Sequence, residues 1–222
     1  MSPSTRLDSG DSRPIYRSQH AVHAGAEPFG TRHRDREQKR FAVLTAAADL
    51  FISQGYRQTR LDDIAERLTI TKPALYNYFR SKQDILLGCH MLGHDIFDRG
   101  FEDIEREGGD GASRLSKLIR VYAGVMTEKF GMCLVRLDRK ELSAAAQRQI
   151  RVRRRAVNAR FERYLEMGNA DGTLMKCDPK FTSFAMAGAL NWIAYWYRPD
   201  GELSSGQIGE LFVQSLIRRA AP

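Results

Sequence analysis

Apolar residues recur at helical spacing along most of the chain. The first stripe follows residue 35 and consists of Phe41, Leu44, Ala48, Phe51 and Ile52. Positions three and four apart share one face of a helix, and Gly55 then supplies the glycine that commonly follows a helix C-terminus. No segment alternates apolar and polar residues over the length of a strand. The pattern therefore predicts an all-α fold.

Turn and capping residues divide the rest of the chain into further helices. Thr59 and Asp62 have the spacing of a capping box at the start of a short helix around Ile64, and Thr71 and Ser81 are suited to cap the next two helices. The helix after Thr71 is expected over residues 72–79, and the helix after Ser81 continues to the glycine-rich stretch at 108–111. Five more helices are expected over residues 112–129, 132–140, 143–168, 179–197 and 204–219.

Positive charge is concentrated in two segments. The whole chain carries +8, but Arg32–Lys82 holds 11 Lys and Arg against 6 Asp and Glu, and Arg148–Arg163 holds 7 Arg against one Glu. The remainder is therefore at −3. A local basic surface suits a phosphate-bearing partner, because binding displaces counterions from a polyanion. Solvated helix faces would explain the same runs of arginine.

The chain has no apolar run of the ~18 residues that a membrane span needs, and its N-terminus lacks the apolar stretch of a signal peptide. Cys89, Cys133 and Cys177 form no CxxC motif, which argues against a disulfide framework and a structural zinc site. His90 and His94 share a helix face, but a metal would need further ligands, so packing or pocket lining is the simpler interpretation. We expect a cytoplasmic protein with no membrane partner, cofactor or metal.

Motifs for catalysis are absent from the sequence. It contains no GxGxxG, GxxxxGK[ST], GxSxG or HExxH, and no carboxylate cluster of the kind found on facing helices of helical enzymes. We therefore expect no catalytic residues and no enzyme activity. A helical enzyme and a DNA-binding protein that responds to no ligand stay open as alternatives to a regulator.

Two short helices joined by about three residues, after a longer helix, form a helix-turn-helix pattern, whose second helix suits the major groove. In that helix Leu75 and Phe79 are four apart and should pack inward. Its other residues lie away from this stripe. Lysine and tyrosine can hold phosphates, and Asn77 can bond a base edge. The outward residues are Lys72, Ala74, Tyr76, Asn77 and Tyr78.

Residues 59–65, 70–79 and 80–82 resemble the N-terminal signature of the TetR family of bacterial transcription repressors, with three motifs in the same order and separation. The resemblance covers about residues 36–87. It implies an all-helical homodimer with two N-terminal DNA-binding heads, a divergent C-terminal domain and a ligand that releases DNA. By position, it implies a DNA-binding set in which Lys72, Pro73, Ala74, Asn77 and Tyr78 meet bases or backbone, Thr71, Tyr76 and Lys82 hold phosphates, and Arg60 stands where the family often has a small hydroxyl residue.

Thr69 departs from the family pattern. The family usually has glycine or asparagine at this turn position, because those residues tolerate a left-handed backbone. A β-branched residue raises the free energy of the folded state if the left-handed conformation is kept. We therefore expect either strain or a different turn geometry at Thr69.

A second resemblance lies near the C-terminus. Gly188–Trp192 and Trp196–Leu203 are similar to the corresponding segment of TetR-type regulators that respond to acyl-CoA thioesters and commonly control catabolism. It implies an acyl-CoA or a similar hydrophobic metabolite as effector. Ordinary core or dimer-interface roles stay open for each aromatic residue. The candidate ligand-binding residues are Arg151, Arg154, Phe184, Gly188, Asn191, Trp192 and Tyr195.

Arg154 falls within the apolar stripe of the arginine-rich helix, between Ile150 and Val157. The stripe continues through Phe161, Tyr164 and Leu165. An inward-directed guanidinium must find an anion, because an unpaired buried charge costs several kcal/mol. Two kinds of partner are open: an internal acid such as Asp138 or Glu141, or the phosphates of a ligand.

These observations predict three parts. Residues 1–33 are expected to form a disordered tail, residues 34–82 a helix-turn-helix DNA-binding domain, and residues 83–222 a ligand-binding and dimerisation domain. The chain should form a homodimer through its last two helices and bind a palindromic operator in double-stranded DNA, with half-sites about one helical turn apart. A hydrophobic effector that lacks CoA is the alternative ligand.

Overall fold

The computed structural model describes residues 30–219, with side chains from residue 34 onward. Within that range the chain is helical, and its only strand-like feature is an isolated bridge between Leu174 and Arg219. The predicted all-α class is confirmed. The helices are α1 (Gly30–Ser53), α2 (Leu61–Arg67), α3 (Lys72–Tyr76), α4 (Lys82–Glu107), α5 (Gly111–Thr127), α6 (Lys129–Arg136), the 3₁₀ helix η1 (Arg139–Glu141), α7 (Ala144–Asp171), α8 (Pro179–Trp196) and α9 (Ser205–Leu216).

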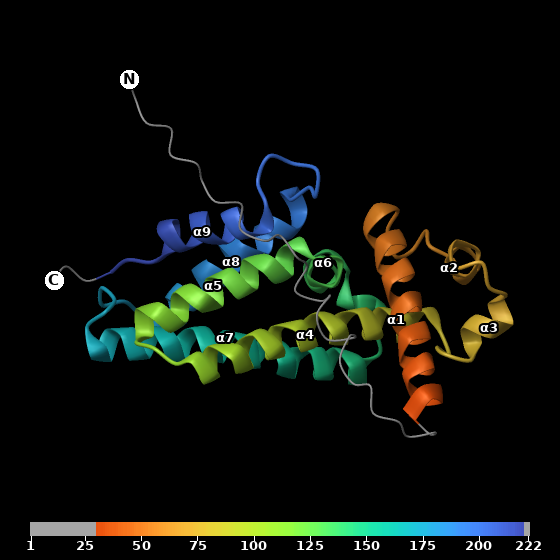
Figure 1. Cartoon of the computed structure of the whole chain (residues 1–222), viewed down its shortest axis with the longest axis horizontal. Helices are drawn as coiled ribbons and strands as arrows, with labels where there is room; N and C mark the ends of the chain where they lie inside the picture. Colours follow the sequence, from red (N-terminus) through yellow and green to blue (C-terminus); the bar gives the residue numbers. More distant parts are fainter. Residues whose placement is uncertain (1–29, 220–222) are drawn as a thin grey trace.

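Helices α1, α2 and α3 form a head at one end of the molecule, and α4 runs from this head into a larger body (Figure 1). In the body, α5 packs against α4, α7, α8 and α9, while α6 lies between the body and α1. No helix within residues 30–219 is long and apolar enough to cross a membrane. The predicted tail falls almost wholly in residues 1–29, which lie outside the described part, and α1 already begins at Gly30.

The head folds around the predicted apolar stripe. Phe51 of α1, Ile64 of α2, and Leu75 and Phe79 from the second short segment are all buried in one core. Arg40 of α1 reinforces this packing: its guanidinium carbon lies 4.3 Å from the centre of the Phe79 ring. The inward orientation predicted for the two apolar residues of the second short helix is therefore confirmed.

Three local predictions need correction. The N-cap of α2 is Arg60 and not Thr59: the backbone N–H of Arg60 donates to the Asp63 carboxylate at 2.7 Å, while the buried Thr59 hydroxyl donates to the Gly55 carbonyl at 2.8 Å. The helix expected to reach residue 79 ends at Tyr76, and Asn77 and Tyr78 form a turn that leads to the buried Phe79. The helix expected over 132–140 is divided into α6 and η1, with a break at Leu137 that buries the leucine side chain.

Thr69 has a left-handed backbone, the first of the two possibilities predicted from the sequence. Its φ of 54° makes it the one non-glycine residue with positive φ in the described range. The turn is held in this conformation by its neighbours, since the Thr69 N–H donates to the Glu66 carbonyl at 2.9 Å and the Ile70 N–H donates to the Ala65 carbonyl at 3.0 Å. The expected turn is therefore kept, together with its strain.

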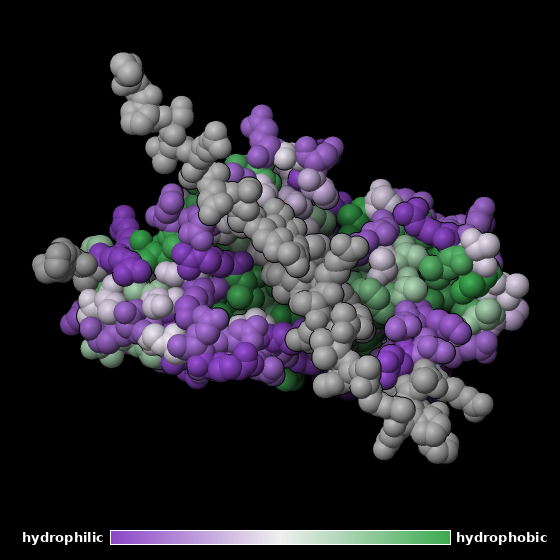
Figure 2. All heavy atoms as spheres, viewed as in Figure 1, coloured by the Kyte–Doolittle hydropathy of each residue, from purple (hydrophilic) through white to green (hydrophobic). Residues whose placement is uncertain are grey.

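Acid–base pairs join α4 and α7 in the body. Arg153 of α7 lies 2.9 Å from Asp95 and also pairs with Asp98, and Arg160 lies 3.2 Å from the second oxygen of Asp98. Hydrophilic residues accordingly cover α4 and α7 on the face seen in Figure 2. Part of the arginine run thus belongs to intramolecular ion pairs and is not free surface charge.

Candidate DNA-reading head and ligand pocket

The second short helix presents its polar residues on the outer surface of the head. Tyr76 and Asn77 are exposed, and Tyr78 is half-buried. The Thr71 hydroxyl accepts the Ala74 N–H at 3.3 Å and caps α3, while Pro73 occupies the first turn, where a missing N–H costs little. The structure therefore places the sequence-predicted residues of this segment together on one accessible surface.

Two basic residues of the predicted DNA-binding set already have partners. The Lys72 ammonium lies 2.9 Å from the Asp62 carboxylate, so a phosphate would compete with that acid. The Lys82 ammonium points inward, donating to the Tyr56 carbonyl at 2.8 Å and the Thr59 carbonyl at 2.9 Å. It also lies 4.2 Å from the centre of the Tyr56 ring, and burial lowers its pKa. Lys82 joins α4 to the loop before α2, which differs from the phosphate contact expected for it.

Sequence reasoning missed part of the basic surface next to this helix. Arg36 and Lys39 of α1 line a shallow surface hollow together with Asn77 and Tyr78. Both basic residues are exposed. Their spacing of three places them on one helix face, and this signal was available in the sequence. Arg60 is exposed at the start of α2.

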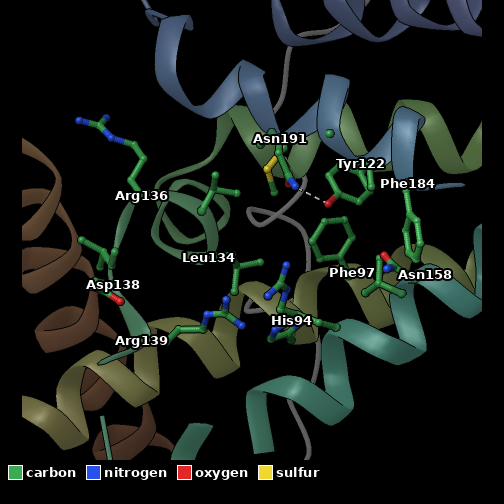
Figure 3. Close-up of a pocket in the computed structure, with 17 residues that line it drawn as sticks. His94, Phe97, Tyr122, Leu134, Arg136, Asp138, Arg139, Asn158, Phe184 and Asn191 are labelled. Atoms are coloured by element: carbon green, nitrogen blue, oxygen red, sulfur yellow. Dashed lines mark hydrogen bonds between the residues drawn. The ribbon is translucent and has the colours of Figure 1, made fainter. Parts of the chain in front are cut away.

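A cavity of 540 Å³ lies in the body, close to the head. Its size falls within the range of ligand sites in proteins, roughly 300–1,000 Å³. Figure 3 shows residues from α4, α5, α6, α7 and α8 around it. The lining comprises His94, Phe97, Tyr122, Met126, Leu134, Val135, Arg136, Leu137, Asp138, Arg139, Arg154, Val157, Asn158, Phe184, Ala187, Gly188 and Asn191.

Four of the seven predicted ligand residues line this cavity: Arg154, Phe184, Gly188 and Asn191. The Asn191 side-chain oxygen accepts the Tyr122 hydroxyl at 2.8 Å, as the dashed line in Figure 3 marks. Burial raises the pKa of Tyr122 to about 12, so this phenol stays a neutral donor. Apolar side chains and a few fixed polar groups thus share one cavity that is open to solvent on one side.

The other three predicted ligand residues do not line the cavity. Arg151 is exposed on α7, one turn before Arg154, which lines the cavity. Trp192 and Tyr195 lie on the outer side of α8, with exposed fractions of 62% and 52% and ring centres 5.3 Å apart. α8 is apolar on both sides, and its outer face carries these aromatic rings while Asn191 borders the cavity.

Arg154 has neither of the internal partners considered from the sequence. Asp138 accepts the backbone N–H of Lys140, and Glu141 pairs with Arg57 of the head. Within residues 34–219 no carboxylate lies within ion-pair distance of the Arg154 guanidinium. Arg154 is exposed and borders the cavity. Of the two kinds of partner left open by the sequence, pairing with Asp138 or Glu141 is therefore excluded, and the inward direction expected for Arg154 is wrong, because the residue is exposed at the border of the cavity.

His94 lines the cavity, and its neighbour His90 is fully buried. Burial is the main reason that the pKa of each imidazole is lowered to about 4; the charge of neighbouring arginines acts in the same direction, and His94 also acts on His90. Both rings are therefore neutral at pH 7. No group of three or more metal-ligating side chains occurs among the described residues, so the structure gives this pair no additional metal ligands.

One segment forms part of both the cavity and the contact with the head. Leu137, Asp138 and Arg139 line the cavity. On either side of them, the Arg57 Nε of the head donates to Glu141 Oε1 at 2.7 Å, and the Arg136 guanidinium donates to the Ile52 carbonyl at the end of α1 at 3.1 Å. A change in the cavity wall can therefore reach the head through a few residues of chain.

Two family models match this chain. The model described as "Bacterial regulatory proteins, tetR family" matches residues 43–89, and the model described as "Tetracyclin repressor-like, C-terminal domain" matches residues 108–220, which is just over half of the chain. The chain belongs to the TetR family. This TetR-family protein is thus a helix-turn-helix transcription regulator, and the resemblance seen in residues 36–87 is confirmed.

Individual relatives agree with this assignment. The TetR-family chain is 24% identical over 185 residues to the transcriptional repressor KstR2 of Mycolicibacterium smegmatis, covering 81% of this chain and 89% of the relative. It is 30% identical over 99 residues to the transcriptional activator FasR of the same organism, a match that spans 45% of either chain. Because these relatives include a repressor and an activator, they do not fix the direction of regulation.

Solved structures show the same fold. A TetR/AcrR-family regulator from Thermobifida fusca is 31% identical with a TM-score of 0.60, covering 81% of this TetR-family chain and 96% of that chain. AibR in complex with isovaleryl coenzyme A and operator DNA is 24% identical with a TM-score of 0.72, covering 81% and 98%. KstR2 of Mycobacterium tuberculosis is 22% identical with a TM-score of 0.75, covering 81% and 95%.

Proposed function

We propose that this protein is a ligand-responsive repressor that leaves its operator when an acyl-CoA or a similar hydrophobic metabolite enters the body cavity. The observation that carries the proposal is the segment from Arg136 to Glu141, which lines the cavity and is also hydrogen-bonded to the head. A ligand can act on DNA only if it binds one arrangement of the heads more tightly than the other. A hundredfold preference corresponds to about 2.7 kcal/mol.

The acyl-CoA part of the proposal rests on the cavity and on one structural neighbour. AibR has been solved with isovaleryl coenzyme A and operator DNA, and its fold is similar to this one. In this chain, Phe97 and Phe184 would contact an acyl group, and Arg154 lies where phosphates can approach from solvent. A hydrophobic effector without CoA is the second candidate, which the apolar side chains of the lining, such as Phe97, Leu134 and Phe184, would contact. Either regulator would act in the cytoplasm and control catabolic genes.

We further propose a homodimer formed through α8 and α9. Exposed aromatic residues follow one face of α8 at helical spacing, namely Phe181, Trp192 and Tyr195, and Phe184 stands at the edge of this face, where it also borders the cavity. Gly188 lies in the middle of this face, and a Cβ atom there would have no neighbour within 4 Å, so a second helix can approach closely. A large exposed apolar patch is typical of an interaction surface. Two heads joined in this way would bind a palindrome.

Operator selection from a randomised duplex pool, followed by fluorescence anisotropy, tests the DNA part. We expect Asn77→Ala to change the base preference, costing roughly 1–3 kcal/mol at one base pair. Lys72→Ala should instead weaken all duplexes similarly and reduce the salt dependence of binding. Unchanged base preferences in Asn77→Ala, with only lower affinity, would show that Asn77 does not read a base.

Titration of the protein–operator complex with isovaleryl-CoA and with isovalerate tests the ligand part. We expect the CoA ester to raise the operator Kd at lower concentration than the free acid. Glu141→Gln, which removes the ion pair with Arg57, should reduce the ligand-induced change in Kd without abolishing ligand binding. Arg154→Ala should weaken the response to the ester, and Arg151→Ala, a matched arginine outside the cavity, should not. An operator Kd that no such compound changes would contradict ligand control.

A further inference from the structure

The cavity contains an imidazole that has no hydrogen-bond partner. His94 is 3% exposed, and neither its Nδ1 nor its Nε2 atom is hydrogen-bonded to any part of the chain that the structure describes. His90, one turn earlier on α4, is buried and unpartnered in the same way. A neutral imidazole offers one donor and one acceptor, and leaving buried polar atoms unpaired costs about 1–3 kcal/mol. A ligand group that bonds His94 would recover this free energy.

Three guanidinium groups border the same space: Arg136 donates to the Ile52 carbonyl of the head, and the other two have no ion-pair partner in the described part of the chain. Arg139 of η1 and Arg154 of α7 both line the cavity, and no carboxylate among residues 34–219 lies within ion-pair distance of either. Burial, followed by the nearby charge of Arg154, lowers the pKa of Arg139. Figure 3 shows the Arg139 side chain directed toward His94. Arg153, which precedes Arg154 on α7, forms ion pairs with Asp95 and Asp98 of α4.

The cavity has few compensating negative charges. Asp138 is its one acidic lining residue within the described range, and its carboxylate accepts the Lys140 N–H at 2.9 Å. Tyr122 of α5 and Asn191 of α8 are neutral and bonded to each other. Among the residues that the structure describes, Arg139 and Arg154 have no ion-pair partner, and His94 beside them has no hydrogen-bond partner. This local excess of positive charge favours binding of an anion.

We propose that the effector is an organic anion whose acidic oxygens enter the cavity beside His94 and between Arg139 and Arg154, and that its binding places a proton on His94. The inference rests on the proposed function only in taking this cavity as the effector site. The hydrocarbon part of the anion lies against Phe97 and Phe184. A carboxylate and a phosphate monoester share the required chemistry, namely oxygen acceptors with negative charge.

The proton uptake has a defined direction with pH. Without ligand, His94 has a pKa of about 4, lowered by burial and by the positive charges of Arg153 and Arg154. Arg139 borders the same cavity and acts on the neighbouring His90, which also interacts with His94, while the Asp98 carboxylate one turn away pairs with α7 arginines. An anion beside the ring favours the charged form and raises the pKa of His94. Affinity is therefore highest at low pH and falls as the pH rises through the pKa of His94 in the complex, by at most about tenfold per pH unit for one proton.

Binding of three six-carbon probes to the full chain without DNA tests the proposal: hexanoate, hexyl phosphate and neutral hexan-1-ol. Thermal shift and isothermal titration calorimetry should show at least one anion binding about tenfold more tightly than the alcohol, and which anion binds identifies the acidic group. Titrations with hexanoate in MES and in Bis-Tris at pH 6.0 should give different enthalpies, because a proton is taken from the buffer. Affinity for hexanoate should be lower at pH 7.5 than at pH 5.5.

Variants separate the residues involved. Arg139→Gln and Arg154→Gln should each weaken anion binding about tenfold, a change of about 1.4 kcal/mol. Arg151→Gln, on the same helix outside the cavity, should leave it unchanged. His94→Gln should remove the buffer dependence of the enthalpy, and if this variant fails to fold, the two arginine variants and the pH series still decide the matter.

Equal binding of the alcohol and the anions, binding of none of the three at 5 mM (roughly the limit of weak affinity), or a buffer-independent enthalpy in the unaltered chain would overturn the proposal. These results are distinct from failure of the proposed function. Anion binding with the expected pH dependence, together with an operator Kd that no ligand changes, would refute ligand control and support the anion site.

Discussion

Replacement of Thr69 by asparagine should stabilise the protein. Thr69 is exposed, its side chain makes no hydrogen bond within the described residues, and its φ is 54°. A left-handed backbone costs an ordinary L-residue roughly 1–2 kcal/mol, and a β-branched side chain belongs at the upper end of that range. Asparagine visits this region readily, so Thr69→Asn should raise the unfolding free energy by about 1 kcal/mol.

The expected change is measurable by scanning calorimetry. For a chain of this size, 1 kcal/mol corresponds to roughly 2–4 °C in Tm. Thr69→Gly should give a smaller gain, because glycine relieves the same strain but adds conformational freedom to the unfolded chain, an opposing effect of roughly 0.5–1 kcal/mol.

Thr69→Val is the matched control. Valine keeps the β-branch and the backbone strain and removes only the hydroxyl, so its Tm should not rise. A Tm of Thr69→Asn at or below that of the unaltered protein would refute the strain argument. An equal rise in Thr69→Val would assign the effect to the hydroxyl and not to the backbone.

Three further changes test other parts of the structure. Because the folded pKa of His90 and of His94 is about 4 against an ordinary 6.5, the stability that each contributes is complete above pH 6.5 and decreases toward pH 4, by roughly 1 kcal/mol at pH 5.5 and roughly 3 kcal/mol at pH 4. In urea unfolding at a series of pH values, the variant His90→Gln/His94→Gln should lose less stability toward pH 4 than the unaltered protein. Equal pH dependence of the unfolding free energy in the two proteins would contradict this prediction. Gly131→Ala places a Cβ 1.7 Å from a backbone carbonyl oxygen and should cost about 1–3 kcal/mol or more in thermal unfolding, whereas Gly206→Ala meets nothing within 4 Å and should change little. Trp192→Ser should weaken the dimer in sedimentation velocity experiments while the far-UV spectrum is kept, because the ring is exposed in the single chain; an unchanged dimer would place the interface elsewhere.

The sequence by itself determined the helices and the family. Helical periodicity and capping are local properties, so the stripe of α1 and the cap at Ser81 could be predicted from neighbouring residues. The strained turn at Thr69 could be anticipated for the same reason, since the turn is fixed within a few residues. The N-cap of α2 was predicted to within one residue, at Thr59, and the structure places it at Arg60.

Only the tertiary structure decided which polar groups meet. Arg153 and Arg154 are consecutive, and the periodic pattern directed Arg154 inward, yet α4 places its acids beside Arg153 and leaves Arg154 at the cavity. Lys82 bonds carbonyls more than twenty residues earlier in the chain. Such pairings depend on how distant helices dock, and a rotation of about 100° between successive helix positions changes the partner.

The docking of distant helices also separated the predicted ligand residues, of which four line the cavity and three do not. Asn191 and Trp192 are neighbours in one C-terminal motif, but they point about 100° apart around α8, so that one borders the cavity and the other faces solvent. Arg139 could not be anticipated, because nothing near it in sequence indicates that η1 closes the cavity. The sequence supplies the chemical groups of the site, and the packing of helices far apart in the chain decides which of them share it.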